Sequence, residues 1–333
     1  MSVVSEDRAR IESAIRRRYG EAARVEDLRL ATLGQSNRTW LLDIVESGGA
    51  RREAVLRQET YQGPGNPFLP SHKQYRAICI ARELGVPTPE PFFLFEEADG
   101  LGQGFAMARV EGETLPKKIL EDPAFASVRP RLAYQCGEIF ASLHRCSEEA
   151  LAFLADSPDS VDPIRAQRDR IDAYREAHPA LELGLRWLEL NRPREVTRTL
   201  VHGDMRNGNF IVGEDGIRAV LDWECCHIGD PLEDLGWLCT RSWRFGRYDR
   251  PVGGFGKRAD LYAGYRSVAG REIDEREARY WEIFGLVRWA AINLMQAFGH
   301  VELGRSSVVF AACGRNCAEM EYDLLRTLDG SFD

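Results

Sequence analysis

Short apolar runs separated by turn residues fill the first part of the chain. Runs of strand-forming residues, with the turns GQSN and ESGG between them, predict three consecutive strands at 29–33, 38–44 and 54–57. Two later runs, at 89–97 and 104–110, flank the turn ADGLG and predict two more strands. The pattern therefore predicts a small, mainly antiparallel sheet.

Helical spacing appears on either side of the first three strands. A charged segment at 5–19 predicts an N-terminal helix. The Gly/Pro-rich segment at 60–71 predicts an irregular loop, and apolar residues at helical spacing in 72–85 predict a helix that Gly85 ends. After the first helix, the order of elements is therefore β-β-β-α-β-β.

The remaining chain, from about Pro116 onward, is mostly helical in its apolar spacing. Besides an apolar stripe at 132–143, helical segments are predicted around 163–190, 231–243, 259–269 and 275–298. A helical lobe after a sheet lobe predicts an α+β fold, divided into residues 1–110 and 111–333. The hairpin at 200–222, described below, is the main exception in the second part.

Composition excludes some classes of function. The 333 residues are 44% hydrophobic, which suits one large domain or two lobes. A net charge of −8 argues against a nucleic-acid-binding protein. No apolar run reaches the about 18 residues of a membrane span, and the charged start lacks the apolar stretch of a signal peptide. We expect a cytoplasmic protein without nucleic-acid or membrane partners, its eight cysteines reduced and mostly buried.

A short polar loop lies between apolar flanks in LVHGDMRNGNFIV, residues 200–212. It contains His202, Asp204 and Asn209. A single Asp or Asn in a loop more often forms a turn or a cap than a ligand, and a single His is more often structural. The combination of the three with the segment that follows points to chemistry.

That segment predicts a β-hairpin around the Gly-bounded turn at 213–216. If Val212 pairs with Ile217, then Asn209 and Asp222 lie at the same open end of the hairpin and on one face. A carboxylate and an amide oxygen suit Mg²⁺, which binds one or two carboxylates together with waters and substrate phosphates. Asp204 would remain available to accept a hydroxyl proton, as phosphoryl transfer requires.

The segment GDPLEDLGW, residues 229–237, predicts a helix start. Asp230 has the position of an N-cap, Pro231 of the first helical residue and Glu233 of a capping-box acid. Asp234 falls one turn into this helix and is expected to reach back to the backbone of the 202–209 loop.

The motifs HGDMRNGN, VLDWE and GDPLEDLGW resemble those of the aminoglycoside phosphotransferase and choline kinase branch of the protein-kinase-like fold. They are especially similar to bacterial phosphotransferases that resemble the kinase-like domain beside acyl-CoA dehydrogenases. The resemblance runs from about Leu28 to the C-terminal helices. It implies a two-lobed fold with a nucleotide-binding lobe, ATP and Mg²⁺ as cofactors, and a small-molecule hydroxyl as acceptor.

The resemblance also implies roles for residues. Asp204 would be the catalytic base, Asn209 and Asp222 the Mg²⁺ ligands, and His202 a residue that shapes the loop. The expected nucleotide contacts are the phosphate-covering turn LGQSN, the third strand and the hinge MARV, with Gly34, Ser36, Asn37, Arg57, Met107, Ala108 and Val110.

Two positions depart from the usual kinase pattern. Arg57 stands where most kinases have a lysine, and arginine can still bind phosphate oxygens bidentately. Gln74 stands where the family often has a glutamate partner, so a contact between Arg57 and Gln74 would be a hydrogen bond to a neutral acceptor.

Other functions remain open at this stage. One is a nucleotide-binding module without phosphotransfer, or an adenylyl transferase. Another is a metal-dependent hydrolase that uses His202, Asp204, Asp222 and His227 as ligands. The arginine-rich segment at 241–258 is either a solvated surface loop or the border of a site for an anionic acceptor, such as a hydroxyacyl thioester. The acceptor, the choice between ATP and GTP and the oligomeric state do not follow from the sequence.

Overall fold

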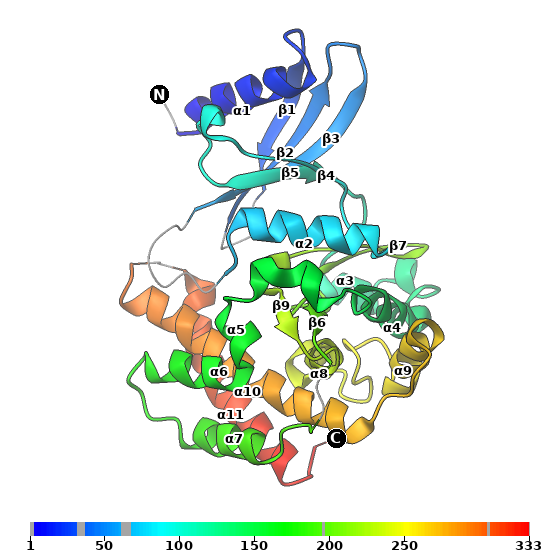
Figure 1. Ribbon diagram of the computed structural model, residues 1–333, viewed down its shortest axis with the longest axis vertical. Coiled ribbons are helices and arrows are strands. Elements are labelled where there is room, and N and C mark those ends of the chain that lie inside the picture. Colours follow the sequence, from blue (N-terminus) through cyan, green and yellow to red (C-terminus); the bar gives the residue numbers. More distant parts are fainter. Residues whose placement is uncertain (1–2, 32–36, 61–67, 195–196, 305–306, 333) are drawn as a thin grey trace. The chain divides into compact units, whose positions relative to one another are not determined.

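The computed structural model describes residues 3–31, 37–60, 68–194, 197–304 and 307–332 (Figure 1). The chain forms two compact units, one of residues 1–112 with 218–225 and the other of residues 113–217 with 226–333. The first unit holds an antiparallel sheet, and the second is mainly helical. The predicted α+β fold is confirmed.

Five antiparallel strands form the sheet of the first unit, in the spatial order β1-β2-β3-β5-β4. The strands are β1 (Arg24–Leu30), β2 (Asn37–Val45), β3 (Arg51–Glu59), β4 (Pro91–Leu94) and β5 (Gly104–Ala108). The other elements are α1 (Val3–Tyr19), α2 (Ser71–Glu83), and the 3₁₀ turns η1 (Glu97–Asp99) and η5 (Trp223–Cys225). The predicted order β-β-β-α-β-β is confirmed. Much of the predicted loop at 60–71 and most of the turn GQSN lie outside the described residues.

The core of the first unit forms where α1 covers the sheet. Ile11 and Ile15, one helical turn apart, are buried with Trp40, Leu42 and Leu56 from β2 and β3. Alternation along the strands places these side chains on the covered face. The apolar alternation of the sequence thus fixes which face of the sheet α1 protects.

Helices make up most of the second unit. They are α3 (Pro116–Glu121), α4 (Leu132–Leu143), α5 (Pro158–Val161), α6 (Pro163–Asp172), α7 (Pro179–Leu190), α8 (Leu232–Cys239), α9 (Arg258–Ala269), α10 (Glu275–Val301) and α11 (Val308–Leu328). Short 3₁₀ turns are η2 (Pro123–Phe125), η3 (Arg129–Arg131), η4 (Glu148–Leu154) and η6 (Arg241–Arg244). Strands β6 (Thr199–Val201) and β9 (His227–Gly229) pair with each other, and β7 (Phe210–Gly213) with β8 (Gly216–Val220) makes the predicted hairpin.

The structure refines several predicted helices. The segment 163–190 is two helices, because Pro179 disfavours a helical conformation at His178 and begins α7 itself. The helix predicted at 231–243 ends at Cys239 and continues as η6. Strand β9 and helix α11 were not predicted. Three residues are too few for β9 to show a period.

Close packing of α8 against α10 fixes the helix that follows the polar loop. A Cβ atom at Gly236 would lie 2.5 Å from the backbone of Trp281, so only glycine allows this approach. Trp281 and Phe284 of α10 are buried, as their helical spacing indicates. Because α8 is held this tightly, the side chains of its first turn have defined positions.

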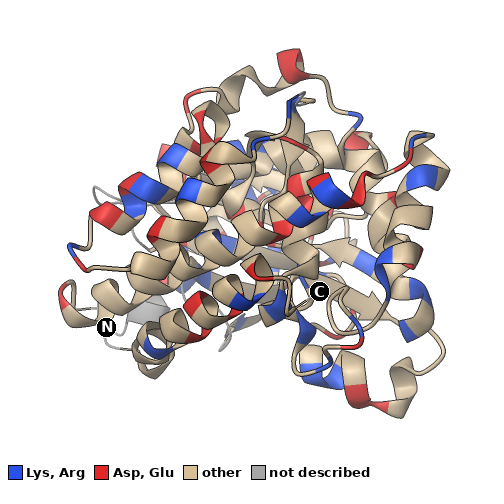
Figure 2. Ribbon diagram, turned by 90° about the horizontal axis from the view of Figure 1, so that it is seen from below, with Lys and Arg blue, Asp and Glu red and all other residues tan. Residues whose placement is uncertain are grey.

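Charged residues of both signs are interspersed along the helices, as Figure 2 shows. Arg165 and Asp169, one turn apart on α6, form a pair of the kind that gives little net stability at the surface. All eight cysteines are free, and six of them are buried. Among the described residues, none of the helices combines the length and apolar character needed to cross a membrane.

Candidate functional site

Asp204 and Asn209 form a closed loop in the second unit, between β6 and β7. The side-chain nitrogen of Asn209 donates to the carboxylate of Asp204 over 2.7 Å and to its carbonyl oxygen over 2.8 Å. The backbone nitrogen of Asn209 donates to the carbonyl oxygen of Arg206. Both hydrogen bonds of the Asn209 side chain use its nitrogen, so its amide oxygen is the atom that could reach a cation.

The carboxylate of Asp204 is held but accessible. Its Oδ1 atom accepts a hydrogen bond of 3.2 Å from the indole nitrogen of Trp237, and Nε of Arg206 lies 3.3 Å away. The guanidinium of Arg206 stacks on Trp243 at 4.6 Å from the ring centre. Because 20% of the Asp204 side chain is exposed, the carboxylate can still meet a reactant.

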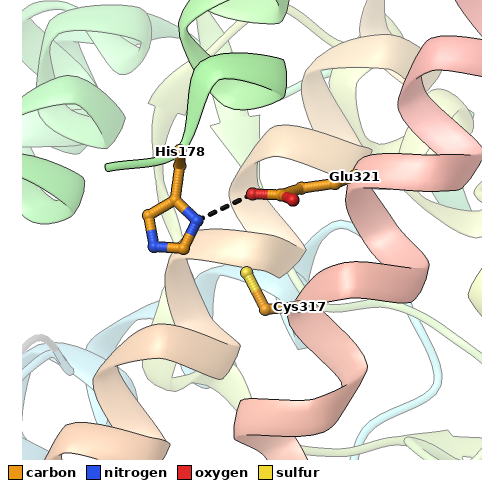
Figure 3. A group of neighbouring side chains, drawn as sticks. All are labelled: His178, Cys317 and Glu321. Atoms are coloured by element: carbon orange, nitrogen blue, oxygen red, sulfur yellow. Dashed lines mark hydrogen bonds and ion pairs between the residues drawn. The ribbon is translucent and has the colours of Figure 1, made fainter. Parts of the chain in front are cut away.

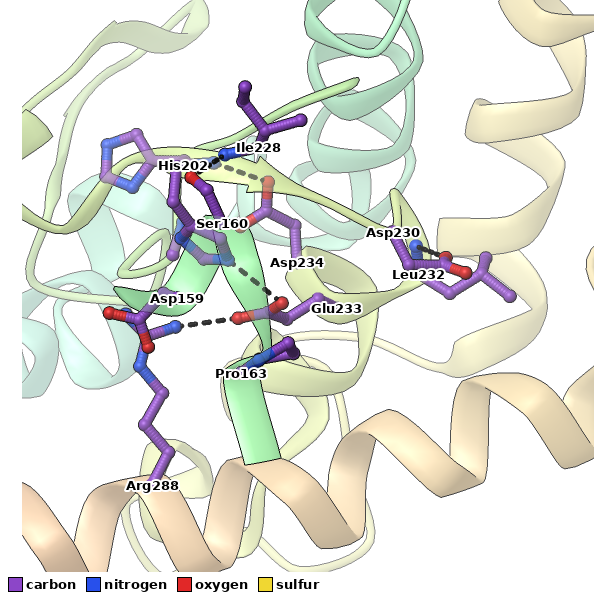
Figure 4. Close-up of polar contacts among 12 residues, drawn as sticks. Asp159, Ser160, Pro163, His202, Ile228, Asp230, Leu232, Glu233, Asp234 and Arg288 are labelled. Atoms are coloured by element: carbon purple, nitrogen blue, oxygen red, sulfur yellow. Dashed lines mark hydrogen bonds and ion pairs between the residues drawn. The ribbon is translucent and has the colours of Figure 1, made fainter. Parts of the chain in front are cut away.

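His202 and Asp234 shape the backbone of this loop, as Figure 4 shows. The carboxylate of Asp234 accepts hydrogen bonds of 2.9 Å from the backbone nitrogens of His202 and Gly203. His202 is buried, and its Nδ1 accepts from the backbone nitrogen of Asp204 over 3.1 Å. The predicted reach of Asp234 back to the loop is confirmed.

A buried histidine completes the support of the loop. His144 is the C-cap residue of α4, and its Nε2 lies 3.2 Å from the carboxylate of Asp234. Burial opposes ionisation of Asp234, but hydrogen bonds and the charge of His144 outweigh it and hold its pKa below the ordinary value. Asp234 thus links α8, α4 and the loop of Asp204.

The first unit contains a second polar cluster, around Arg57 of β3. Its guanidinium donates to Asp222 over 2.7 Å and to Glu224 over 3.4 Å. Asn37 donates to the same carboxylate of Glu224 over 3.3 Å. Burial opposes the charge of Arg57, but the two carboxylates outweigh it and raise the pKa of the guanidinium. Asp222 itself has a left-handed backbone, with φ of 61°, which Asp adopts more readily than most residues.

The prediction that Gln74 contacts Arg57 is wrong. Gln74 is buried on α2, but its side-chain nitrogen donates to the carbonyl oxygen of Leu69 over 2.6 Å. The acceptors of Arg57 are the carboxylates of Asp222 and Glu224 instead. Arg57 is therefore held by ion pairs and not by a hydrogen bond to a neutral amide.

The other expected nucleotide-binding residues also belong to the first unit. Met107 lies opposite Val55, and Ala108 opposite Ala54, at the end of β5, which Val110 follows. The backbone nitrogen of Ala108 donates to the carbonyl oxygen of Glu90 over 2.8 Å. Gly34 and Ser36 lie outside the described residues. Asp222 is in the first unit and Asn209 in the second, so their joint role as metal ligands stays a prediction.

The expected capping box at the start of α8 is only half right. Oδ1 of Asp230 accepts from the backbone nitrogen of Leu232 over 2.8 Å and so caps the helix. Glu233 instead accepts from Arg288 over 2.9 Å and from Nε2 of His227 over 3.1 Å. All three side chains are buried, and a buried carboxylate requires such charged partners.

This pairing bears on the hydrolase alternative. Burial lowers the pKa of His227, but the charge of Glu233 outweighs it and the net pKa is raised. The Nε2 atom of His227 already contacts the carboxylate of Glu233. Within the described part of the chain, His202, Asp204 and His227 do not form a group with metal-binding spacing.

The arginine-rich segment 241–258 is largely committed to the fold. Arg244 is fully buried and donates to Glu282 over 2.7 Å, and Arg258 donates to the same carboxylate over 2.8 Å. Arg241 stacks between Tyr248 and Phe332, at 3.6 and 3.9 Å from the two ring centres. Arg244 is therefore neither a solvated residue nor a border residue, whereas Arg241 and Arg258 are partly exposed and paired within the second unit.

The chain is similar to known proteins in sequence and fold. The model of the phosphotransferase enzyme family matches residues 27–271, about three quarters of the chain. The chain belongs to the phosphotransferase enzyme family. The matched range includes both polar clusters, so the loop of Asp204 and the cluster of Arg57 are parts of one family sequence.

Proteins similar to this chain differ in length. Acyl-CoA dehydrogenase family member 10 of Mus musculus is 29% identical over 228 residues, which are 62% of this chain and only 19% of the mouse protein. The chain therefore corresponds to about a fifth of that relative. A protein of Ralstonia eutropha described as an aminoglycoside phosphotransferase has a TM-score of 0.73 at 22% identity, covering 97% of this chain and 98% of the other.

A second structure similar to this chain contains a bound nucleotide analogue and a bound antibiotic. An aminoglycoside phosphotransferase in a ternary complex with AMP-PNP and hygromycin B has a TM-score of 0.58 at 18% identity. The match covers 94% of this chain and 98% of the neighbour. Together with the Ralstonia structure it shows that the two-lobed, protein-kinase-like fold expected from the motifs is present.

Three residues of the two polar clusters were not predicted from the sequence. Glu224, the partner of Arg57, lies two residues after Asp222 in VLDWE, and this motif was the available signal. Trp237, at the end of GDPLEDLGW, follows Asp234 by three residues, so both lie on one face of α8. The contact between His144 and Asp234 could not be predicted, because 90 residues separate them in the sequence.

Proposed function

We propose that this protein is an ATP-dependent phosphotransferase that moves the γ-phosphoryl group to a hydroxyl of a small molecule. The proposal rests mainly on the hydrogen bonds and the partial exposure of Asp204. Its carboxylate is fixed by Asn209 and Trp237 and remains partly exposed. A general base must be oriented and must also meet its substrate, and Asp204 satisfies both conditions.

Asp204 acts as the general base in this proposal. Asn209 and Trp237 each donate to a different oxygen of the carboxylate, so its orientation is set before the acceptor binds. The proton of the attacking hydroxyl passes to a carboxylate oxygen as its oxygen bonds to the γ-phosphorus, while the bond from that phosphorus to the β,γ-bridging oxygen breaks and ADP leaves. Arg206, beside Asp204, would attract the negative charge of the transferred group.

Asn209 and Asp222 are the proposed ligands of Mg²⁺. The donor set fits the ion, since it offers one carboxylate and one amide oxygen and leaves other positions to water and phosphate. Bound Mg²⁺ would neutralise charge on the phosphates of the nucleotide. The carboxylate of Asp222 is 41% exposed, so an ion in solution can reach it.

The cluster of Arg57 is the proposed phosphate clamp. Arg57 forms ion pairs with Asp222 and Glu224. We infer that Arg57 turns from Asp222 to phosphate oxygens when the nucleotide binds, while Glu224 keeps the guanidinium in place. The expected turn residues Gly34, Ser36 and Asn37 would contribute to the same phosphate site, and Met107, Ala108 and Val110 to the adenine site.

The nature of the nucleotide and of the acceptor rests on similarity alone. The neighbour with AMP-PNP and hygromycin B supports nucleotide binding and a small-molecule acceptor. The name of the mouse relative makes hydroxyacyl thioesters worth testing. An anionic acceptor has less support than the sequence indicated, because Arg244 and Arg258 are paired with Glu282.

The decisive experiment combines the protein with Mg·ATP and a pooled library of hydroxyacyl thioesters, amino alcohols, sugars and aminoglycosides. Mass spectrometry then identifies any compound that gains mass, with Asp204→Asn as the control variant. A phosphoryl gain that the variant does not produce supports the proposal and names the acceptor class. A gain of an adenylyl group would identify an adenylyl transferase instead. Stabilisation by nucleotide with no product would favour a binding module that does not transfer.

A further inference from the structure

A group of three potential metal ligands lies in the second unit, apart from the loop of Asp204. It consists of His178, Cys317 and Glu321 (Figure 3). One ligand atom from each side chain lies within 4.8 Å of the others. Nδ1 of His178 already contacts Oε1 of Glu321 over 2.7 Å. None of the three residues has a role in the proposed phosphotransfer.

Local structure brings these side chains together. Cys317 and Glu321 are four residues apart on α11, which places both on the same helix face. His178 is the residue before α7, where Pro179 fixes the start of the helix. Its ring therefore extends from a rigid helix end toward one face of α11, as Figure 3 shows.

The donor set selects the kind of ion. Thiolate, imidazole and carboxylate are the three ligand types of Zn²⁺, and its catalytic and open sites have three protein ligands plus water. Ligand atoms around tetrahedral Zn²⁺ are about 3.4–3.6 Å apart, given the usual bond lengths. The ligand atoms lie within 4.8 Å of one another, so binding would widen the 2.7 Å contact between His178 and Glu321 and bring Cys317 to the same ion. Mg²⁺ and Ca²⁺ prefer oxygen ligands and do not fit.

The ring of His178 offers Nδ1 to the group and keeps Nε2 on its far side (Figure 3). Within the described residues Nε2 has no hydrogen-bond partner, and the carboxylate of Glu176 lies 3.5 Å from it. A histidine that binds a metal through one ring nitrogen commonly donates the other ring N–H to a carboxylate, a role that Glu176 is placed to fill.

We propose that His178, Cys317 and Glu321 bind one Zn²⁺ ion, which ties helix α11 to the start of α7. Cys317 is buried, so the ion must displace its proton, as in other thiolate sites. The bound ion would join segments 139 residues apart, from position 178 to position 317, and would stabilise the C-terminal helix on the rest of the unit. This inference does not depend on the proposed phosphotransfer.

Titration of the metal-free protein with Co²⁺ under reducing conditions tests the site, since Co²⁺ bound to thiolate gives a strong near-ultraviolet absorption band. We expect one equivalent of Co²⁺ to produce the band and Zn²⁺ to abolish it by displacement. Cys317→Ser should lose the band. Cys313→Ser is the matched control, because this buried cysteine lies one turn earlier on α11 and should leave the band unchanged.

Two more measurements keep the test independent of folding. Glu321→Gln keeps a hydrogen-bond acceptor for His178 but removes the anionic ligand, and should weaken Co²⁺ binding by about 10-fold or more. Zn²⁺ at about 100 times its Kd should raise the Tm of the wild type by about 5 °C or more, and that of Cys317→Ser much less. A folded wild type without the band, or a band that survives in Cys317→Ser, overturns the proposal.

Discussion

The guanidinium of Arg57 donates to the carboxylate of Asp222 over 2.7 Å, although 165 residues separate them in sequence. Both belong to the first unit, and Glu224 provides the second carboxylate. The residue proposed to bind Mg²⁺ is therefore also the ion-pair partner of Arg57, the residue proposed to bind the phosphates. Under the proposed function, a metal ion at Asp222 and phosphate oxygens at Arg57 would compete with this ion pair.

Asp222→Asn should weaken the binding of Mg·ATP without unfolding the protein. The amide is a weaker ligand for a hard cation than the carboxylate, whereas Asn adopts the left-handed backbone of this position as readily as Asp. Calorimetric titration should show Mg·ATP affinity lowered about 10-fold or more, with little change in Tm. Glu214→Gln, an exposed acid on the hairpin turn, is the control. Wild-type affinity in Asp222→Asn would contradict the proposed ligand role.

Asp204→Asn should lower kcat by about 10² to 10⁴, because the amide cannot accept the hydroxyl proton. The amide oxygen can still accept from Trp237, whereas the amide nitrogen would face Asn209, which keeps its hydrogen bond to the backbone carbonyl oxygen of residue 204. A Tm close to that of the wild type checks that the loop keeps its structure. Steady-state kinetics with the identified acceptor measures kcat. Transfer at the wild-type rate would rule out a base at this position.

Asp234→Asn should destabilise the protein and slow transfer together. An amide has one oxygen for the two backbone donors of His202 and Gly203, and its nitrogen would face another donor. Because Asp234 is fully buried, breaking this network should cost about 3 kcal/mol or more of unfolding free energy. Denaturant unfolding measures the loss, and Asp249→Asn, an exposed acid, should leave stability unchanged. Equal stability of Asp234→Asn and wild type would contradict this role.

The same carboxylate predicts a pH dependence. The folded-state pKa of Asp234 is below its ordinary value. Its contribution to stability is therefore present at pH values above the ordinary pKa and is lost as pH falls through the lowered value. In Asp234→Asn this part of the acid destabilisation should be absent from the profile of Tm against pH.

Asp230→Asn should stabilise the protein at neutral pH. Burial first, and then the neighbouring charges of Glu233 and Glu277, raise the pKa of Asp230 to about 6, against the hydrogen bond from Leu232. A raised pKa means that the folded state gains stability as pH falls through 6, and that ionisation costs stability above it. The amide avoids this cost and keeps an acceptor for Leu232.

Thermal unfolding between about pH 4 and 8 measures the effect of Asp230→Asn. The gain over wild type should be up to about 3 kcal/mol at pH 7 and should disappear near the ordinary pKa of an aspartate. A gain that does not change with pH would have another origin, and a loss at pH 7 would contradict the burial argument.

Local contacts of the candidate site followed from the sequence. Asp204 and Asn209 are five residues apart in one tight loop, and their contact needs no distant partner. Asp234 lies in a motif whose helical spacing already directs it back to the loop. The strands and helices with clear periods, such as β2, α4 and α10, were also predictable, because burial of one face imposes a period of 2.0 or 3.6 residues.

Long-range pairing was decided only by the tertiary structure. Arg57 has a carboxylate partner at Glu224 and not the amide of Gln74, and Arg244 is inside the second unit and not at its surface. His178 meets Cys317 and Glu321 across a long stretch of chain. No period in a sequence records such contacts, because a charged side chain is stabilised by whichever opposite charge the folded chain brings beside it. The sequence determined the elements and the local loop, and the packing of those elements determined which charges are paired.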